Sequence, residues 1–122
     1  ISEGSLPTLL LEDIPSFLKE LGNSFCFIDN KYKIKLGSIY NYIDLLLYNI
    51  RFKCYVVIEL KVTELKKEHI GQIETYMNYI DKNIKTIDED KTIGIIIVKK
   101  EDKYIMEYCS DKKIITKEYK LL

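Results

Sequence analysis

The sequence has little or nothing of several residue types. Its 122 residues include no alanine, no tryptophan, one histidine and two prolines. No apolar run approaches the ~20 residues that a membrane-spanning helix needs, so we expect no membrane contact. The three cysteines are odd in number and lack metal-ligand spacing (Cys26, Cys54 and Cys109). They favour reduced thiols in a cytoplasmic protein over a disulfide framework.

An excess of charge of one sign is also missing, because 19 basic residues balance 19 acidic ones. The chain as a whole therefore shows no general signature of a polyanionic partner. All basic residues except Arg51 are lysines, and isoleucine and tyrosine are also abundant. We interpret this composition as the codon bias of an AT-rich genome rather than as a nucleic-acid signature.

The size of the chain and its hydrophobic content of 47% predict a single folded domain. We expect a flexible lead-in over residues 1–8 and the domain over residues 9–122. Because the chain begins at Ile1, we also expect it to be the C-terminal part of a longer protein.

Apolar periodicity predicts an alternation of helices and strands. Helical spacing indicates one helix over residues 9–21 and a second over residues 66–82. Gly22 ends the first of these helices. On the second helix, the apolar face is expected to comprise Ile70, Ile73, Met77 and Ile80, and Gly71 suggests close packing against a sheet. Strands are predicted over residues 25–36, 42–48, 54–60, 92–98 and, more weakly, 104–108. The order α-β-β-β-α-β, followed by a short strand, predicts a mixed α/β sandwich.

Three charged residues interrupt or end strands that otherwise have the composition of buried ones. Asp44 lies in YIDLLLY, and Glu59 and Lys61 lie in VVIELKV. A hairpin that turns at Arg51 and Phe52 would place Asp44 opposite Glu59 and residue 42 opposite Lys61. With strict alternation, the three charged side chains then project from one face.

Two carboxylates this close do not both ionise comfortably unless a cation lies between them. Mg²⁺ is a natural occupant, since it takes one or two carboxylates together with waters and phosphate oxygens. Lys61 could then hold a water or neutralise the attacked phosphate, and the pattern suits metal-assisted phosphodiester hydrolysis. The alternative is an ordinary salt-bridged patch in which both carboxylates pair with lysines.

Five sequence blocks occur in the order FLKELGNSFCFI, YIDLLLYN, VVIELKV, HIGQIETYMNYID and TIGIIIVKK. With these blocks, the chain from about residue 9 to residue 122 resembles the YhcG-type C-terminal domain of the PD-(D/E)xK nuclease superfamily. The resemblance implies a restriction-endonuclease-like three-layer sandwich, in which helices flank a mixed central sheet with an αβββαβ core. It also implies Mg²⁺-dependent cleavage of DNA, with Mn²⁺ able to substitute.

The resemblance also implies roles for individual residues. Asp44 and Glu59 would bind the metal, together with the backbone carbonyl of Leu60, and Lys61 would complete the E-x-K motif. Glu20 matches a glutamate that related nucleases often carry on their first helix, and on its own it is more typical of an exposed charge.

The second predicted helix adds Gln72, which matches a glutamine of the family, and Tyr76 one turn later. Both lie off the expected apolar face and would reach the site or the sugar–phosphate backbone; the alternative is a polar flank. His69 stands where the family is expected to have a tyrosine, and we expect it to be solvent-exposed.

The predicted strand 25–36 carries Lys31, Lys33 and Lys35 in alternation, which would place three ammonium groups on one face. They could follow a phosphate backbone, although a solvated face is the plainer interpretation. Tyr40 and Tyr42 could stack on a base or ribose, but we expect them to pack in the core.

The leading hypothesis is therefore a metal-dependent deoxyribonuclease. The alternatives are a non-catalytic nucleic-acid-binding or assembly module that retains the fold, and a nuclease for RNA or branched DNA. A homodimer is possible, because duplex DNA offers two strands to cut. Members of this family usually carry an additional N-terminal helical region, which would be a further partner of this domain.

Overall fold

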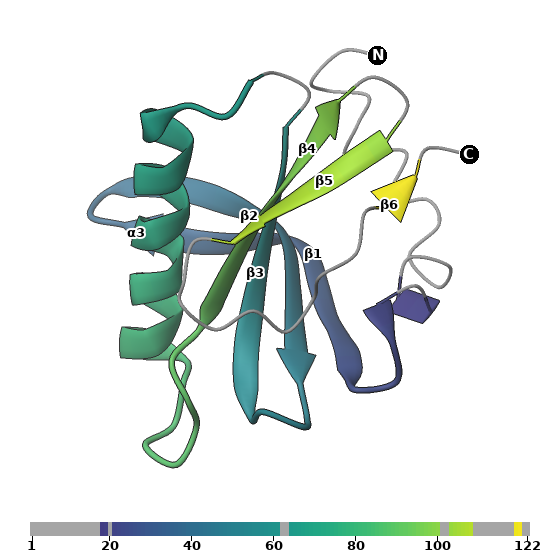
Figure 1. Cartoon of the computed structure of the whole chain (residues 1–122). Helices are drawn as coiled ribbons and strands as arrows, with labels where there is room; N and C mark the ends of the chain where they lie inside the picture. Colours follow the sequence, from purple (N-terminus) through teal and green to yellow (C-terminus); the bar gives the residue numbers. More distant parts are fainter. Residues whose placement is uncertain (1–17, 20, 62–63, 101–102, 109–118, 121–122) are drawn as a thin grey trace.

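The computed structural model describes residues 18–19, 21–61, 64–100, 103–108 and 119–120. Six strands form one sheet in the order β1-β2-β3-β4-β5-β6, and only the β3–β4 pair is parallel. Helix α3 connects the two parallel strands and lies against one face of the sheet (Figure 1). The elements are β1 (Phe25–Leu36), β2 (Ile39–Asn49), β3 (Cys54–Lys61), α3 (Lys67–Asn83), β4 (Ile93–Lys100), β5 (Lys103–Tyr108) and β6 (Tyr119–Lys120). The predicted α/β class with a mixed sheet is confirmed.

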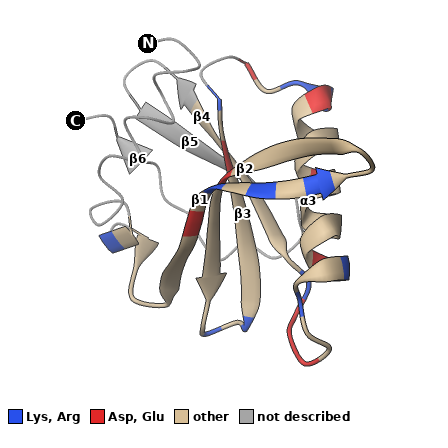
Figure 2. Cartoon of the chain, turned by 180° about the vertical axis from the view of Figure 1, so that it is seen from behind, with Lys and Arg blue, Asp and Glu red and all other residues tan. Residues whose placement is uncertain are grey.

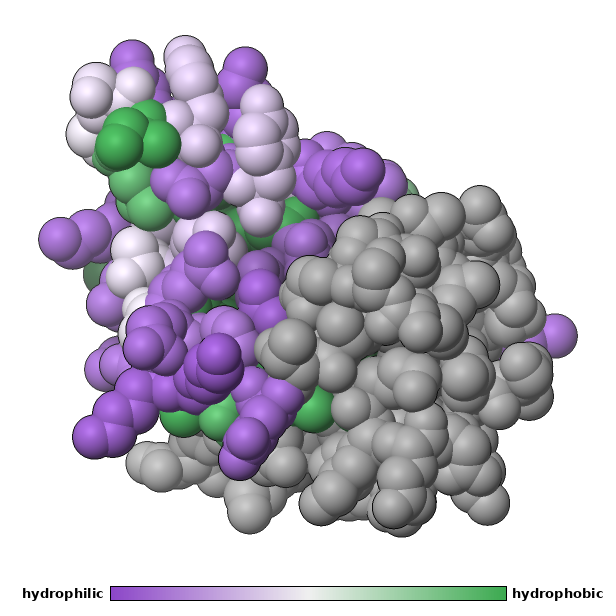
Figure 3. Space-filling model, turned by 90° about the horizontal axis from the view of Figure 1, so that it is seen from above, coloured by the Kyte–Doolittle hydropathy of each residue, from purple (hydrophilic) through white to green (hydrophobic). Residues whose placement is uncertain are grey.

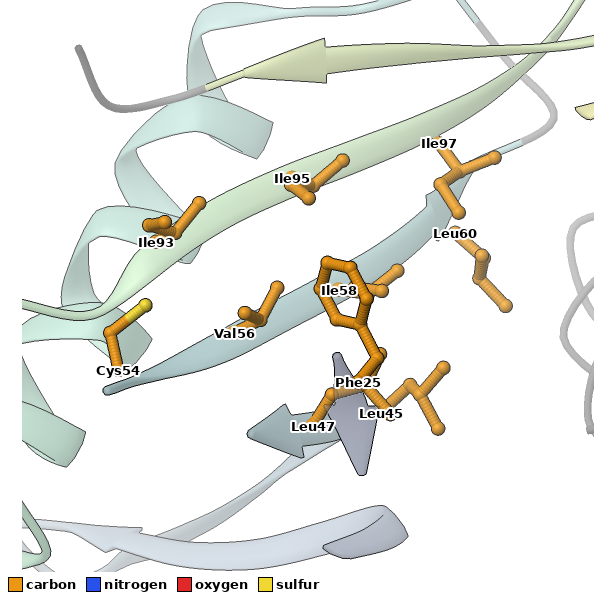
Figure 4. Close-up of a cluster of buried hydrophobic side chains, with 10 residues drawn as sticks. All are labelled: Phe25, Leu45, Leu47, Cys54, Val56, Ile58, Leu60, Ile93, Ile95 and Ile97. Carbon is orange, nitrogen blue, oxygen red and sulfur yellow. The ribbon is translucent and has the colours of Figure 1, made fainter. Parts of the chain in front are cut away.

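One face of the sheet is covered by a first hydrophobic cluster, built from alternate residues of the central strands (Figure 4). Its members are Phe25, Leu45, Leu47, Cys54, Val56, Ile58, Leu60, Ile93, Ile95 and Ile97. Leu18 and Leu21 pack against this cluster and are partly buried. The rest of the predicted helix 9–21 lies outside the described residues, as do the predicted lead-in and Glu20.

The opposite face packs against α3 through a second cluster. Its members are Ile34, Ile43, Leu46, Val57, Ile73, Tyr76, Ile80 and Ile96. The buried residues of α3 are Ile73, Tyr76 and Ile80. The prediction that Tyr76 lies off the apolar face is therefore wrong. The spacing +3 from Ile73 and −4 from Ile80 places the ring on that face, and its apolar body outweighs its hydroxyl.

The glycine that brings helix and sheet together is Gly94 on β4, not Gly71. A Cβ atom added at Gly94 would collide with the sulfur of Met77, whereas one added at Gly71 would meet open space. The prediction of close packing at Gly71 is wrong, because this position faces away from the sheet and is exposed.

The β1–β2 hairpin bends where Lys31 lies opposite Asp44. The register pairs Asn30 with Leu45 and Tyr32 with Ile43, and Lys31 between them has a positive φ of 50°. Beyond this point, residues 31–36 and 39–43 form an extension that we call the hairpin arm, and it reaches across the side of the sheet on which α3 lies (Figures 1 and 2). The bend interrupts strict alternation, so that Ile43 packs in the second cluster although Leu45 packs in the first.

Two further expectations concern the chain as a whole. Of the cysteines, Cys26 is exposed and Cys54 is buried, and the two do not form a disulfide with each other; Cys109 lies outside the described residues. In the part of the chain that the structure describes, no helix has the length and hydrophobicity to cross a membrane.

Candidate active site

Asp44 and Glu59 meet where β2 leaves β3. The backbone ladder between these strands runs from Asn49↔Cys54 to Leu45↔Ile58, in the register that a turn at Arg51 and Phe52 predicts. At the next position along both strands, hydrogen bonds to side chains take the place of the backbone ladder. The backbone N–H of Asp44 donates to Oε2 of Glu59 at 2.8 Å, and the N–H of Leu60 donates to Oδ2 of Asp44 at 2.9 Å.

These two hydrogen bonds fix both carboxylates relative to the backbone. Each carboxylate accepts a hydrogen bond from the strand that carries the other, so neither can rotate away without leaving a backbone N–H to be satisfied elsewhere. Glu59 is only 4% exposed, and Asp44 is half-buried. Two acidic groups are thus held side by side in a partly dry environment, where a cation is attracted far more strongly than in bulk water.

Tyr76 of α3 lies close enough to this acidic pair for the two negative charges to act on its phenol. It is 3% exposed. Its pKa is raised to about 12, first by burial and then by the charges of Glu59 and Asp44, while a hydrogen bond with Gln72 acts in the opposite direction. Tyr76 is therefore a neutral phenol at physiological pH. The structure brings Gln72 and Tyr76 together, with Gln72 exposed and Tyr76 buried.

Lys61 and Leu60 extend the site along β3. Lys61 is half-buried and follows Glu59 by two residues, so the two side chains share a face of the strand. The N–H of Leu60 points to Asp44. Because the N–H and C=O of one strand residue point to the same edge, the carbonyl of Leu60 also faces the side of Asp44. The expected pairing of residue 42 with Lys61 is absent from the ladder, because β2 bends away at Asp44.

The remaining candidate residues are His69 at the start of α3 and Lys31 and Lys33 on β1. His69 is half-buried, and its Nδ1 accepts a hydrogen bond from the backbone N–H of Lys66 at 3.2 Å, which caps the start of α3. Lys31, Lys33 and Lys35 are exposed on β1 and alternate with less exposed residues, and Lys31 lies at the bend with a positive φ of 50°.

Tyr40 and Tyr42 are each 52% exposed, so the expectation that they pack in the core is wrong. Tyr40 and Tyr42 lie two residues apart and therefore share one side of β2, and this side faces solvent. The alternating pattern of residues 39–43 contained this signal, but their aromatic character favoured burial.

The donor set fits a hard divalent cation. Among the described residues, no three His, Cys, Asp or Glu side chains gather in a way that could hold a metal ion. Mg²⁺ does not need three, since it is usually bound through one or two carboxylates and keeps several waters. The carboxylates of Asp44 and Glu59, together with the carbonyl of Leu60, supply oxygen ligands of this kind. Figure 3 shows that the end of the molecule at which β3 ends and α3 begins is largely hydrophilic over its described surface.

The structure thus combines a mixed α/β sheet with an aspartate and an E-x-K sequence on neighbouring strands. The family model described as "YhcG PDDEXK nuclease domain" matches residues 1–122, and the chain belongs to this family. Membership indicates nuclease activity.

A curated relative from Escherichia coli (strain K12), named "Putative nuclease YhcG", is 27% identical over 96 residues. The match covers 79% of this chain and 26% of the relative, so the chain spans about a quarter of that protein. No solved structure gives a significant match.

Proposed function

We propose that this domain hydrolyses phosphodiester bonds of DNA with the help of Mg²⁺, for which Mn²⁺ can substitute. The observation that carries the proposal is the reciprocal pair of hydrogen bonds that holds the Asp44 and Glu59 carboxylates together at the divergence of β2 and β3. This arrangement brings two acidic groups to one point. Such a point suits a cation.

In this proposal the metal ligands are Asp44, Glu59 and the backbone carbonyl of Leu60. A bound divalent cation supplies Lewis acidity toward the phosphate and lowers the pKa of its water. Lys61, on the same face of β3 as Glu59, holds the attacking water or neutralises the charge that develops on the phosphate.

The helix α3 supplies the other wall of the proposed site. The neutral hydroxyl of Tyr76 positions Gln72 through their hydrogen bond, and the exposed Gln72 contacts the substrate. This assignment gives Tyr76 a positioning role instead of direct contact with the sugar–phosphate backbone, because its side chain is buried. Glu20 completes the proposed set from the first helix.

The wider arrangement belongs to the same proposal. The three-layer, restriction-endonuclease-like form would use the helix over residues 9–21 as the layer that covers the first cluster. The domain would occupy residues 9–122 and act with an N-terminal region of a longer, cytoplasmic protein. That the chain spans 26% of its curated relative supports such a region. A homodimer would allow both strands of a duplex to be cut.

Cleavage of supercoiled plasmid and of single-stranded DNA, with Mg²⁺, Mn²⁺ or EDTA, tests the proposal. Glu59→Gln serves as the site variant, because glutamine keeps an acceptor for the N–H of Asp44 while it removes the charge. Ile87→Ala, at a fully exposed position after α3, serves as the control.

We expect cleavage that requires the metal, disappears in Glu59→Gln and persists in Ile87→Ala. Equal cleavage by the parent and Glu59→Gln would contradict the site. A folded protein that binds neither metal in a calorimetric titration would favour the non-catalytic binding module instead.

A further inference from the structure

The hairpin arm has two chemically different faces. On the inner face, Ile34 and Ile43 are fully buried in the second cluster, and Tyr32 and Leu36 pack against it. This face anchors the arm to α3 and the sheet. The opposite face of the arm therefore takes no part in the core, and it carries aromatic as well as charged side chains.

Two lysine–tyrosine pairs occupy that outer face. The register pairs Lys33 with Tyr42 and Lys35 with Tyr40, so that all four side chains point the same way. Both tyrosines are 52% exposed and both lysines are exposed. The Nζ of Lys33 lies 4.2 Å from the centre of the Tyr40 ring, and that of Lys35 lies 5.6 Å from it. Cations that lie over the ring hold an aromatic surface in place at the solvent boundary.

The charge of the arm differs from that of the chain. Residues 30–43 contain three lysines and no acidic residue, whereas the whole chain has a net charge of zero. Figure 2 shows basic residues spaced along β1 in the part of the hairpin that reaches toward α3. The arm is thus a local basic strip with exposed aromatic rings.

We propose that the outer face of the hairpin arm binds single-stranded DNA and leads it to the acidic pair. This proposal rests on the nuclease function proposed above. Lysines attract the phosphates of any nucleic acid, but exposed rings gain contact only with bases whose faces are accessible. In a duplex those faces are stacked on each other. Tyr42 precedes Asp44 by only two residues, about 7 Å along a strand, so the arm adjoins the acidic pair and a strand bound on it would reach the site.

Binding is measured by fluorescence anisotropy of a labelled oligothymidylate with the full chain in EDTA, which prevents metal-dependent cleavage. The test variants are Tyr42→Leu and Tyr40→Leu, each beside the matching Tyr→Phe variant, with Ile87→Ala as an exposed control. Leucine keeps an apolar side chain but loses the π face, whereas phenylalanine keeps it. We expect each leucine variant to weaken binding about fivefold or more, and the phenylalanine variants to bind as the parent does.

The lysines are tested through salt dependence. For single strands, each phosphate contact contributes about 0.7 to the slope of log affinity against log salt concentration. Lys33→Gln and Lys35→Gln should each reduce the slope by about that amount, while Lys91→Gln, at an exposed position outside the arm, should leave it unchanged.

Several results would overturn the proposal. Parent-like binding by both leucine variants would exclude stacking, and a tighter complex with a duplex of equal length would exclude a preference for single strands. Oligouridylate bound as tightly as oligothymidylate would exclude the assignment to DNA. Each result is separable from the nuclease function. Loss of cleavage in Glu59→Gln together with parent-like binding by the leucine variants would support the proposed nuclease function. It would contradict only the proposed binding of single-stranded DNA by the hairpin arm.

Discussion

Asp44 and Glu59 are joined through the backbone of the strands that carry them: the N–H of Asp44 donates to the Glu59 carboxylate, and the Asp44 carboxylate accepts from the residue after Glu59. The β2–β3 ladder ends one residue earlier, at Leu45 and Ile58. Two acidic side chains thus continue a sheet that the backbones have stopped forming. The same two side chains therefore stabilise this part of the sheet and form the proposed metal site. The negative charge of Asp44 and its hydrogen bond should then have separate effects on cleavage and on the free energy of unfolding.

Replacing Asp44 by asparagine should separate these two contributions. The asparagine side chain retains an acceptor for the N–H of Leu60, so we expect a stability close to that of the parent but cleavage reduced at least about 100-fold. Asp44→Ala should lose the same activity and also about 1–3 kcal/mol of stability, because the N–H of Leu60 then has no acceptor from residue 44. Urea unfolding and plasmid cleavage measure the two effects. Cleavage at the parent rate by Asp44→Asn would contradict the proposed metal ligand.

Mg²⁺ should stabilise the folded domain through this site. A ligand that binds only the native state at ten times its Kd adds about 1.4 kcal/mol, enough to raise the Tm by several degrees. Differential scanning fluorimetry with MgCl₂, against NaCl of equal ionic strength, measures the shift. Glu59→Gln should lose most of it, and an undiminished shift in that variant would place the metal elsewhere.

Two phenols with raised pKa values should make stability depend on alkaline pH. Burial and the charges of Glu59 and Asp44 raise the pKa of Tyr76 to about 12, and a hydrogen bond to Glu89 is the main cause that raises the pKa of Tyr48 to about 12. The fold favours the neutral phenol over the phenolate, so this contribution is complete below pH 10, the unfolded value, and is lost as the pH rises through 12.

Urea unfolding at pH 8 and pH 11 tests this sign. Between these values, the parent should lose about 1 kcal/mol more than Tyr76→Phe, because phenylalanine has no proton to release from the unfolded chain. Tyr48→Phe provides a parallel case away from the acidic pair. An identical pH dependence of the parent and Tyr76→Phe would show that the Tyr76 phenol is not perturbed.

Two glycines should respond oppositely to alanine. Gly71→Ala should stabilise the domain by up to about 1 kcal/mol, since the position is helical, exposed and open. Gly94→Ala should destabilise it by about 1–3 kcal/mol, because the new Cβ meets the Met77 side chain. Thermal unfolding of both variants checks the pair. Met77→Ala in the Gly94→Ala background should recover part of the loss, and no recovery would point to another cause.

The sequence itself determined the elements and much of the site. The period of the apolar residues predicted β3, β4 and α3 within a few residues, because each element has one dominant period and a clear apolar face. The turn at Arg51 and Phe52 set the register of β2 and β3, and with it the meeting of Asp44 and Glu59. Local pattern suffices there, because a short hairpin loop leaves few registers to choose from.

The tertiary structure alone decided where that local pattern fails. Lys31 adopts a left-handed conformation opposite Asp44, the hairpin bends there, and Ile43 packs in the second cluster although Leu45 packs in the first. Alternation tells which residues of a straight strand share a face, but a bend depends on how distant segments pack, and no pattern within the strand contains that information.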